Sequence, residues 1–174
     1  MSLPRPENRR RIGPAAYGGL FLVCAVALLA WQLLSPASLE RAVGEAKVAI
    51  QQVAQEVTPG WTGPVVRLGP AGGIRELNWC DGRFIEMTSY RVTGVPPVYA
   101  AHNNCGGDII LGWQLGDHVM IEGSDTVYEV VEERHTPKWT MVTSLKGMAG
   151  DLVLQTCLYG QNRMRFLSLS PVSG

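Results

Sequence analysis

The residues best suited to covalent chemistry lie in two separate segments of the chain. Cys157 follows the apolar run 152–156, and Arg163 and Arg165 come shortly after it. Earlier in the sequence, His102 ends another apolar run and opens a polar, glycine-rich stretch. Together these residue types can attack a peptide carbonyl. The thiolate acts as the nucleophile, the imidazolium gives a proton to the leaving amine, and a guanidinium stabilises the charge on the carbonyl oxygen.

Each of these residues also has an ordinary structural interpretation. His102 alone could be structural or simply exposed, and Cys157 could be a buried free cysteine. Thr156 can contribute to the environment of an oxyanion or be an ordinary strand residue. Residues two apart in a strand point to the same face, so Arg163 and Arg165 can both look toward one site.

The composition excludes few classes of function, but the chain length indicates the size of the domain. The chain has 174 residues, with 15 lysines and arginines and 15 acidic residues, so the formal net charge is +0. This balance gives no whole-chain argument for a nucleic-acid partner, and we expect none. The length suits one modest domain with additional segments.

The N-terminal segments predict a single-pass membrane anchor. Residues 15–34 form an apolar run of about 20 residues without a charge, the length that a helix needs to cross a bilayer. Arginines precede this run, so the positive-inside rule places residues 1–14 in the cytoplasm and the rest outside. A cleaved signal peptide is the alternative, although its apolar core is normally shorter. In either case we expect the domain to work outside the cytoplasm.

Residues 35–60 predict a helical stalk or linker. Between residues 38 and 57, apolar residues recur in steps of four and three and form one stripe. Ser38 can cap the start of this helix, and Pro59 and Gly60 can end it. We expect the stripe to pack on the domain or on the membrane surface. A short coiled-coil dimer is the alternative.

Residues 61–174 predict a mainly β domain. Short β-favouring runs alternate with turn residues, which is typical of a small barrel or sandwich. The predicted strands are 65–68, 74–79, 84–92, 98–101, 118–122, 126–134, 140–143, 152–156 and 164–169.

Cys80 and Cys105 allow three interpretations. Outside the cytoplasm they can form a disulfide, which would stabilise a small domain by about 3 kcal/mol and pin the loop that carries His102. They can also be two unpaired cysteines. A third interpretation is a metal site formed with His102. Its fourth ligand would come from Asp81, Asp108 or Cys157.

Taken in order along the chain, the motifs resemble those of sortases, a family of membrane-anchored cysteine transpeptidases. The stretch LVLQTC and the later NRMRFLSL are similar to the family's active-site strand and arginine strand. Between His102 and Cys157, LGDHVMIEGSDTVYEVVEER is similar to its Gly-Asp strand and the following Tyr-x-Val strand. The resemblance covers residues 65–170 and leaves the subclass unresolved.

The resemblance implies a closed, sortase-like β-barrel of eight strands that needs no organic cofactor or metal. It implies that Cys157 forms a thioacyl intermediate with a secreted protein at a C-terminal sorting signal, often LPXTG-like. An amine from a peptidoglycan precursor or a pilin lysine then resolves this intermediate. His102 would protonate the leaving amine and later take a proton from the incoming one. The Asn-x-x-Arg pattern selects Arg165 as the stabilising cation, with Arg163 as the second choice.

Two other functions stay open at this point. The same residues would serve a cysteine hydrolase, in which water resolves the acyl-enzyme. A membrane-tethered β-barrel that only binds a partner would leave Cys157 buried and His102 incidental. For an enzyme, we expect the loop at about residues 136–150, with Trp139 and Met141, to shape the substrate pocket.

Overall fold

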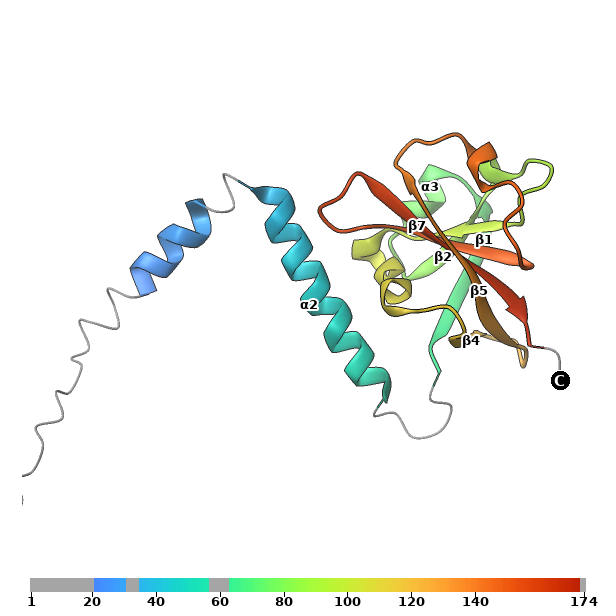
Figure 1. Cartoon of the computed structure of the whole chain (residues 1–174), viewed down its shortest axis with the longest axis horizontal. Helices are drawn as coiled ribbons and strands as arrows, with labels where there is room; N and C mark the ends of the chain where they lie inside the picture. The colour runs from blue at the N-terminus through green and yellow to red at the C-terminus, as the bar shows by residue number, and fades with distance from the viewer. Residues whose placement is uncertain (1–20, 31–34, 57–62, 173–174) are drawn as a thin grey trace, which may run out of the picture.

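The computed structural model describes residues 21–30, 35–56 and 63–172, and it places one long helix beside a β domain (Figure 1). The helix is α2 (Pro36–Glu56). The strands are β1 (Val65–Gly72), β2 (Arg83–Met87), β3 (Val98–Ala100), β4 (His118–Ile121), β5 (Val127–Pro137), β6 (Leu152–Cys157) and β7 (Arg163–Pro171). Short helices connect them: α3 (Ile74–Leu77), η1 (Thr88–Tyr90), η2 (Asn103–Cys105), η3 (Gly107–Gly112) and η4 (Val142–Leu145).

The seven strands form a sheet that closes on itself in the order β1-β2-β3-β6-β7-β5-β4. Strand β1 runs parallel to both β2 and β4, and β3 runs parallel to β6. The remaining neighbours are antiparallel, and the longest ladders join β7 to β5 and β6. The mainly β domain predicted from the sequence is therefore confirmed, with seven strands where the resemblance implied eight.

Two of the nine predicted strands were wrong. Residues 74–79 contain the short helix α3, because the Glu76 carboxylate accepts a hydrogen bond from the Gly73 amide (2.8 Å) and so stabilises a helical turn. Residues 140–143 run into the 3₁₀ helix η4. Their β-branched residues, which favoured a strand, lie in the loop between β5 and β6.

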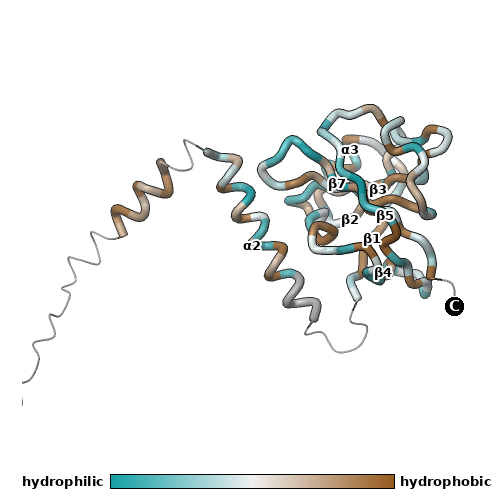
Figure 2. The backbone as a smooth tube through the Cα atoms, in the orientation of Figure 1, coloured by the Kyte–Doolittle hydropathy of each residue, from teal (hydrophilic) through white to brown (hydrophobic). Residues whose placement is uncertain are grey.

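The buried side chains form two clusters, one on each face of the sheet. One cluster fills the inside of the ring and includes Leu152, Leu154, Leu167 and Leu169. The other lies on the outer face, where Val153 and Phe166 are covered by Leu145 and Met148 from the β5–β6 loop. Alternate residues of β6 and β7 therefore face opposite sides of the sheet. The domain as a whole shows hydrophobic and hydrophilic segments interleaved along the chain (Figure 2).

The predicted membrane anchor lies only partly within the described residues. Residues 21–30 form an exposed, largely hydrophobic helix (Figure 2), whereas 15–20 and 31–34 lie outside the described residues, as does the predicted cytoplasmic segment 1–14. Within the described ranges, no helix combines the length and apolarity needed to span a membrane. The anchor stays a prediction from the sequence.

Helix α2 packs against the β domain, which is one of the two placements expected from the sequence. Lys47 forms an ion pair with Asp108 (2.6 Å), whose side chain is fully buried. Gly44 lies directly against the ring of Tyr159, where a Cβ atom would collide with it. Close backbone approach of this kind is what glycine in a helix permits, so the docking depends on these particular residues.

Candidate functional site

Cys157 is the last residue of β6 and lies on the outer face of the sheet. Leu152, Leu154 and Thr156 point to the inside of the ring, so Val153, Gln155 and Cys157 point out of it. The thiol of Cys157 is half-buried and unpaired in the structure. The cysteine is therefore neither sealed in the core nor fully exposed.

His102 lies at the same end of the sheet as Cys157 because β3 and β6 run parallel in a fixed register. Val98 pairs with Val153 and Ala100 with Gln155, an offset of 55 residues. Beyond the last strand pair, the Ala101 amide still donates to the Gln155 carbonyl (3.1 Å). Carried two residues past Ala100, this offset places His102 opposite Cys157. His102 itself follows the end of β3, so this register brings it to the same end of the sheet as Cys157.

Thr156 helps to hold this arrangement. Its hydroxyl, fully buried, donates a hydrogen bond to the Ala101 carbonyl (2.9 Å). The bond joins the residue before Cys157 to the residue before His102. Thr156 faces the inside of the ring, so the structure gives it a positioning role and not the place near an oxyanion that the sequence allowed.

His102 and Cys157 line the same cavity, which has a volume of about 730 Å³. Apolar side chains make up most of its wall, namely Ile74, Leu77, Met87, Tyr90, Val142 and Met164. Lys138, Trp139 and Thr140 line it from the loop after β5. The expectation that this loop shapes a pocket is confirmed, since residues 138, 139, 140 and 142 line the wall.

The charge state of Cys157 is set by opposing influences. Burial raises the pKa of the thiol above its ordinary value, because desolvation disfavours the thiolate. The positive charge of Lys138 and a hydrogen bond from the Gln155 side chain both act to lower the pKa of Cys157. Burial and the neighbouring cysteine also raise the pKa of Tyr90. The resting thiol is therefore mostly protonated and needs a base to form a thiolate at neutral pH.

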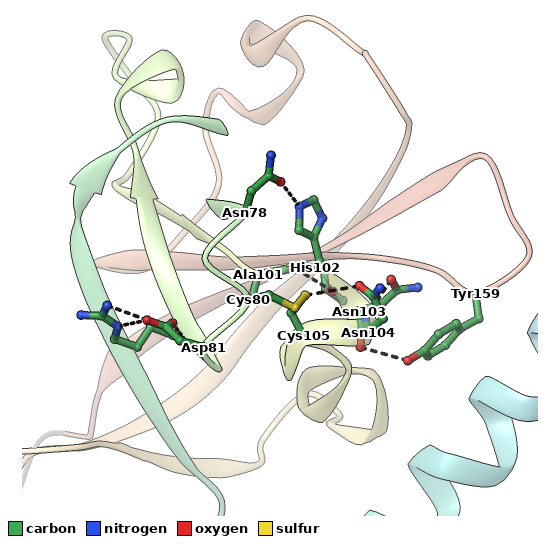
Figure 3. Close-up of a disulfide and its surroundings, with 11 residues drawn as sticks. Asn78, Cys80, Asp81, Ala101, His102, Asn103, Asn104, Cys105 and Tyr159 are labelled. Carbon is green, nitrogen blue, oxygen red and sulfur yellow. Dashed lines mark hydrogen bonds and ion pairs between the residues drawn. A yellow bond between two sulfur atoms is a disulfide. The ribbon is translucent and has the colours of Figure 1, made fainter. Parts of the chain in front are cut away.

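His102 is oriented by Asn78, and a disulfide ties their two segments together (Figure 3). The His102 Nε2 and the Asn78 Oδ1 are 3.0 Å apart. When Nε2–H donates to this amide oxygen, Nδ1 is left to take up or release a proton. Cys80, two residues after Asn78, is bonded to Cys105, three residues after His102, with 4.8 Å between the Cα atoms.

The disulfide decides among the three interpretations of Cys80 and Cys105. A bonded cysteine cannot act as a thiolate ligand, so the metal site formed by His102, Cys80 and Cys105 is wrong. Asp81 instead pairs with Arg83. Across the described part of the chain, no group of three or more histidine, cysteine or acidic residues is placed to hold a metal ion.

Arg165 does not occupy the place predicted for it. Its five N–H groups are all used: two donate to Glu133 (both 2.9 Å) and three to the carbonyls of Ile110, Leu111 and Trp113 (2.9, 2.7 and 2.6 Å). The side chain is nearly buried and does not line the cavity. The reason is the register of the hairpin. Arg165 pairs with Thr156, so it faces the inside of the ring with that residue.

Arg163 does not line the cavity either. It is exposed at the start of β7 and pairs with Pro137 of β5. Met164, which pairs with Cys157, is the β7 residue that lines the cavity. The prediction that both arginines share one face of β7 fits the structure, but that face is not the one that carries Cys157.

Sequence reasoning missed three residues of the site: Asn78, Lys138 and Gln155. The period of a strand gave a signal for Gln155, which is two residues before Cys157 and so shares its face. Lys138 lies in the loop expected to shape the pocket, yet no motif marked it. Asn78 fell in a predicted strand and gave no signal.

The comparisons with known proteins return two solved structures of one family. The chain is similar to a Clostridium perfringens sortase D5 transpeptidase, with 15% identity and a TM-score of 0.45 over 61% of this chain and 70% of that one. It is also similar to Listeria monocytogenes sortase A, with 15% identity and a TM-score of 0.41 over 61% of this chain and 81% of that one. No protein-family model matches the chain, and no curated protein does.

Proposed function

We propose that residues 63–172 form a sortase-type cysteine transpeptidase domain with Cys157 as the nucleophile and His102 as the acid and base. The observation that supports it is that the half-buried Cys157, at the end of β6, and His102, just beyond the end of the parallel strand β3, line one cavity. The proposal also rests on the resemblance of the LVLQTC and NRMRFLSL segments to those of sortases.

The first half of the reaction forms a thioester. His102 takes the proton of the Cys157 thiol, and the sulfur attacks a peptide carbonyl carbon of the substrate. A carbon–sulfur bond forms as the carbon–nitrogen bond of the peptide breaks. The imidazolium of His102 gives its proton to the leaving amine.

The second half transfers the acyl group. A primary amine attacks the thioester carbonyl, a new amide bond forms, and the carbon–sulfur bond breaks. His102 accepts the proton that the incoming amine loses, and Cys157 returns to its starting form. Attack by water in place of the amine would give the hydrolase that the sequence left open.

The cavity wall suits an extended peptide with apolar side chains. Leu77, Met87 and Val142 offer apolar surface close to the thiol, and Trp139 adds an aromatic ring that is 93% exposed. Burial of an apolar substrate side chain against such a wall gains about 1.5–3 kcal/mol. On the resemblance to sortases, we propose exported proteins with a C-terminal sorting signal as substrates, and an amine of a peptidoglycan precursor or a pilin as acceptor.

The proposed location follows from the sequence of the N-terminal segments. Residues 15–34 would anchor the chain in the cell membrane by a single pass, with the N-terminus in the cytoplasm. The β domain would then act outside the cytoplasm, where its disulfide is stable.

Replacement of the two proposed catalytic residues tests the function. We expect Cys157→Ala to abolish cleavage of a quenched LPXTG-like peptide and His102→Ala to reduce it about 10²–10⁴-fold, both without loss of the fold. Cys24→Ala is the matched control, because Cys24 is exposed and outside the cavity. Products analysed with and without triglycine separate transfer from hydrolysis. Turnover that survives in Cys157→Ala would refute the proposal.

A further inference from the structure

Among the described residues that line the cavity, the one with a permanent positive charge is a lysine and not an arginine. Of the described residues that line the wall, Lys138 alone carries a permanent charge. Arg165 faces the other side of the sheet with all its N–H groups used, and Arg163 lies outside the cavity. An acyl transfer to Cys157 therefore has a single lysine available as a local cation.

A tight turn at the end of β5 holds Lys138 in place. Its amide donates to the Asn162 carbonyl (3.1 Å), which ties the turn to the β6–β7 connection. The Thr140 hydroxyl and amide both donate to the Pro137 carbonyl (2.7 and 3.4 Å) and close the turn. The backbone of Lys138 is thus held at the corner between Pro137 and Thr140.

Trp139 shows that this turn is maintained at a cost. Its φ angle of 66° lies in the left-handed region, which costs a residue other than glycine about 1–2 kcal/mol. Its ring is 93% exposed, so burial of the ring within the described chain does not offset this cost. Strained backbone of this kind is concentrated at functional sites.

We propose that Lys138 supplies the positive charge for the chemistry at Cys157, by binding the substrate carbonyl oxygen as it becomes negative. The inference rests on the proposed function. It gives Lys138 the role that the sequence assigned to Arg165. A lysine ammonium acts as a compact point charge with rotatable donors, which can follow the oxygen from the planar to the tetrahedral state.

The other titratable groups near the thiol do not provide this charge. His102 alternates between neutral and charged forms during the reaction, and Tyr90 is held neutral by its raised pKa. The negative charge of Glu40, on α2, acts to raise the pKa of Cys157. Lys138 and the Gln155 side chain both oppose these influences, and of the two only Lys138 carries a charge.

Charge replacement at Lys138 tests the inference in the full chain carrying Cys24→Ser, so that Cys157 is its one free thiol. We expect Lys138→Met to lower kcat for the quenched peptide about 10²–10³-fold, with KM changed much less. Lys138→Arg should stay within tenfold of the parent, and Arg163→Met, the matched control, within twofold. Lys138→Gln repeats the charge loss in case the methionine variant does not fold.

The rate of iodoacetamide alkylation against pH gives a readout that needs no substrate. The midpoint for Cys157 should rise in Lys138→Met and Lys138→Gln, but not in Arg163→Met. A kcat within threefold of the parent in both charge-loss variants, or an unchanged midpoint, would overturn the role of Lys138. Absence of any turnover that depends on Cys157, together with a raised midpoint, would overturn the proposed function and with it the oxyanion role.

Discussion

The disulfide between Cys80 and Cys105 allows a prediction with a defined magnitude. The two residues are 25 positions apart, and their bond closes the loop that contains β2 and β3. In the chain-entropy model, a loop of this length stabilises the folded state by about 3.5 kcal/mol, because the bond restricts the unfolded chain. A domain with a total stability of about 5–15 kcal/mol would lose a large part of it.

The double variant Cys80→Ser/Cys105→Ser measures this contribution. We expect its free energy of unfolding, from urea titration of the full chain, to fall by about 3.5 kcal/mol, which lowers the midpoint by about 1–3 M urea. Reductant should destabilise the parent similarly but leave the double variant unchanged. Cys24→Ser should have no effect, since Cys24 is free.

The same variant tests whether the disulfide also orients His102, the proposed acid and base. The bond joins the segment of Asn78 to that of His102, whose side chains are 3.0 Å apart. We expect turnover to fall even where the double variant is fully folded, since the loop carrying His102 is no longer pinned. A loss of stability below 1 kcal/mol would refute the entropic reasoning, and unchanged turnover would refute the positioning role.

The remaining predictions concern buried ionic groups. Arg165→Met should lower the free energy of unfolding by about 2–4 kcal/mol, because Glu133 and buried carbonyls lose their donor, yet leave the alkylation midpoint of Cys157 unchanged. Full stability with lost turnover would return Arg165 to a catalytic role. Lys47→Met should cost about 1–3 kcal/mol in urea titration, because the fully buried Asp108 loses its counter-ion, and Lys47→Arg should restore most of it. Equal stability of both Lys47 variants would show that the ion pair is not needed.

The sequence was informative about the strands that carry the site. The apolar runs at residues 98–101 and 152–156 end at His102 and Cys157, and β3 and β6 end within one residue of those runs. Local pattern sufficed here because both strands are buried on both faces, which requires continuous apolar sequence. That the two strands are parallel neighbours depends on the closure of the whole ring, which no local pattern encodes.

The register of β6 and β7 explains why Arg165 lies on the other face of the sheet from Cys157. Strand alternation correctly placed Arg163 and Arg165 on one face of β7. Which face they share with β6 depends on the turn at residues 158–162, which pairs Cys157 with Met164. A shift of one residue would have put Arg165 opposite the thiol. The sequence did not indicate Lys138 as a site residue. Its position depends on a turn in which Trp139 adopts a left-handed backbone conformation, which is rare for residues other than glycine.

The docking of α2 limits the distance between the β domain and the segment that precedes α2. An extended chain of 21 residues would reach about 70 Å and would let the domain sample a wide volume. As a helix the same residues span about 32 Å, and contacts with Tyr159 and Gly160 hold it along the domain. In the membrane-anchored enzyme that we propose, α2 would keep the domain at a constant distance from the anchor, so the substrate polypeptide would have to be brought to the domain.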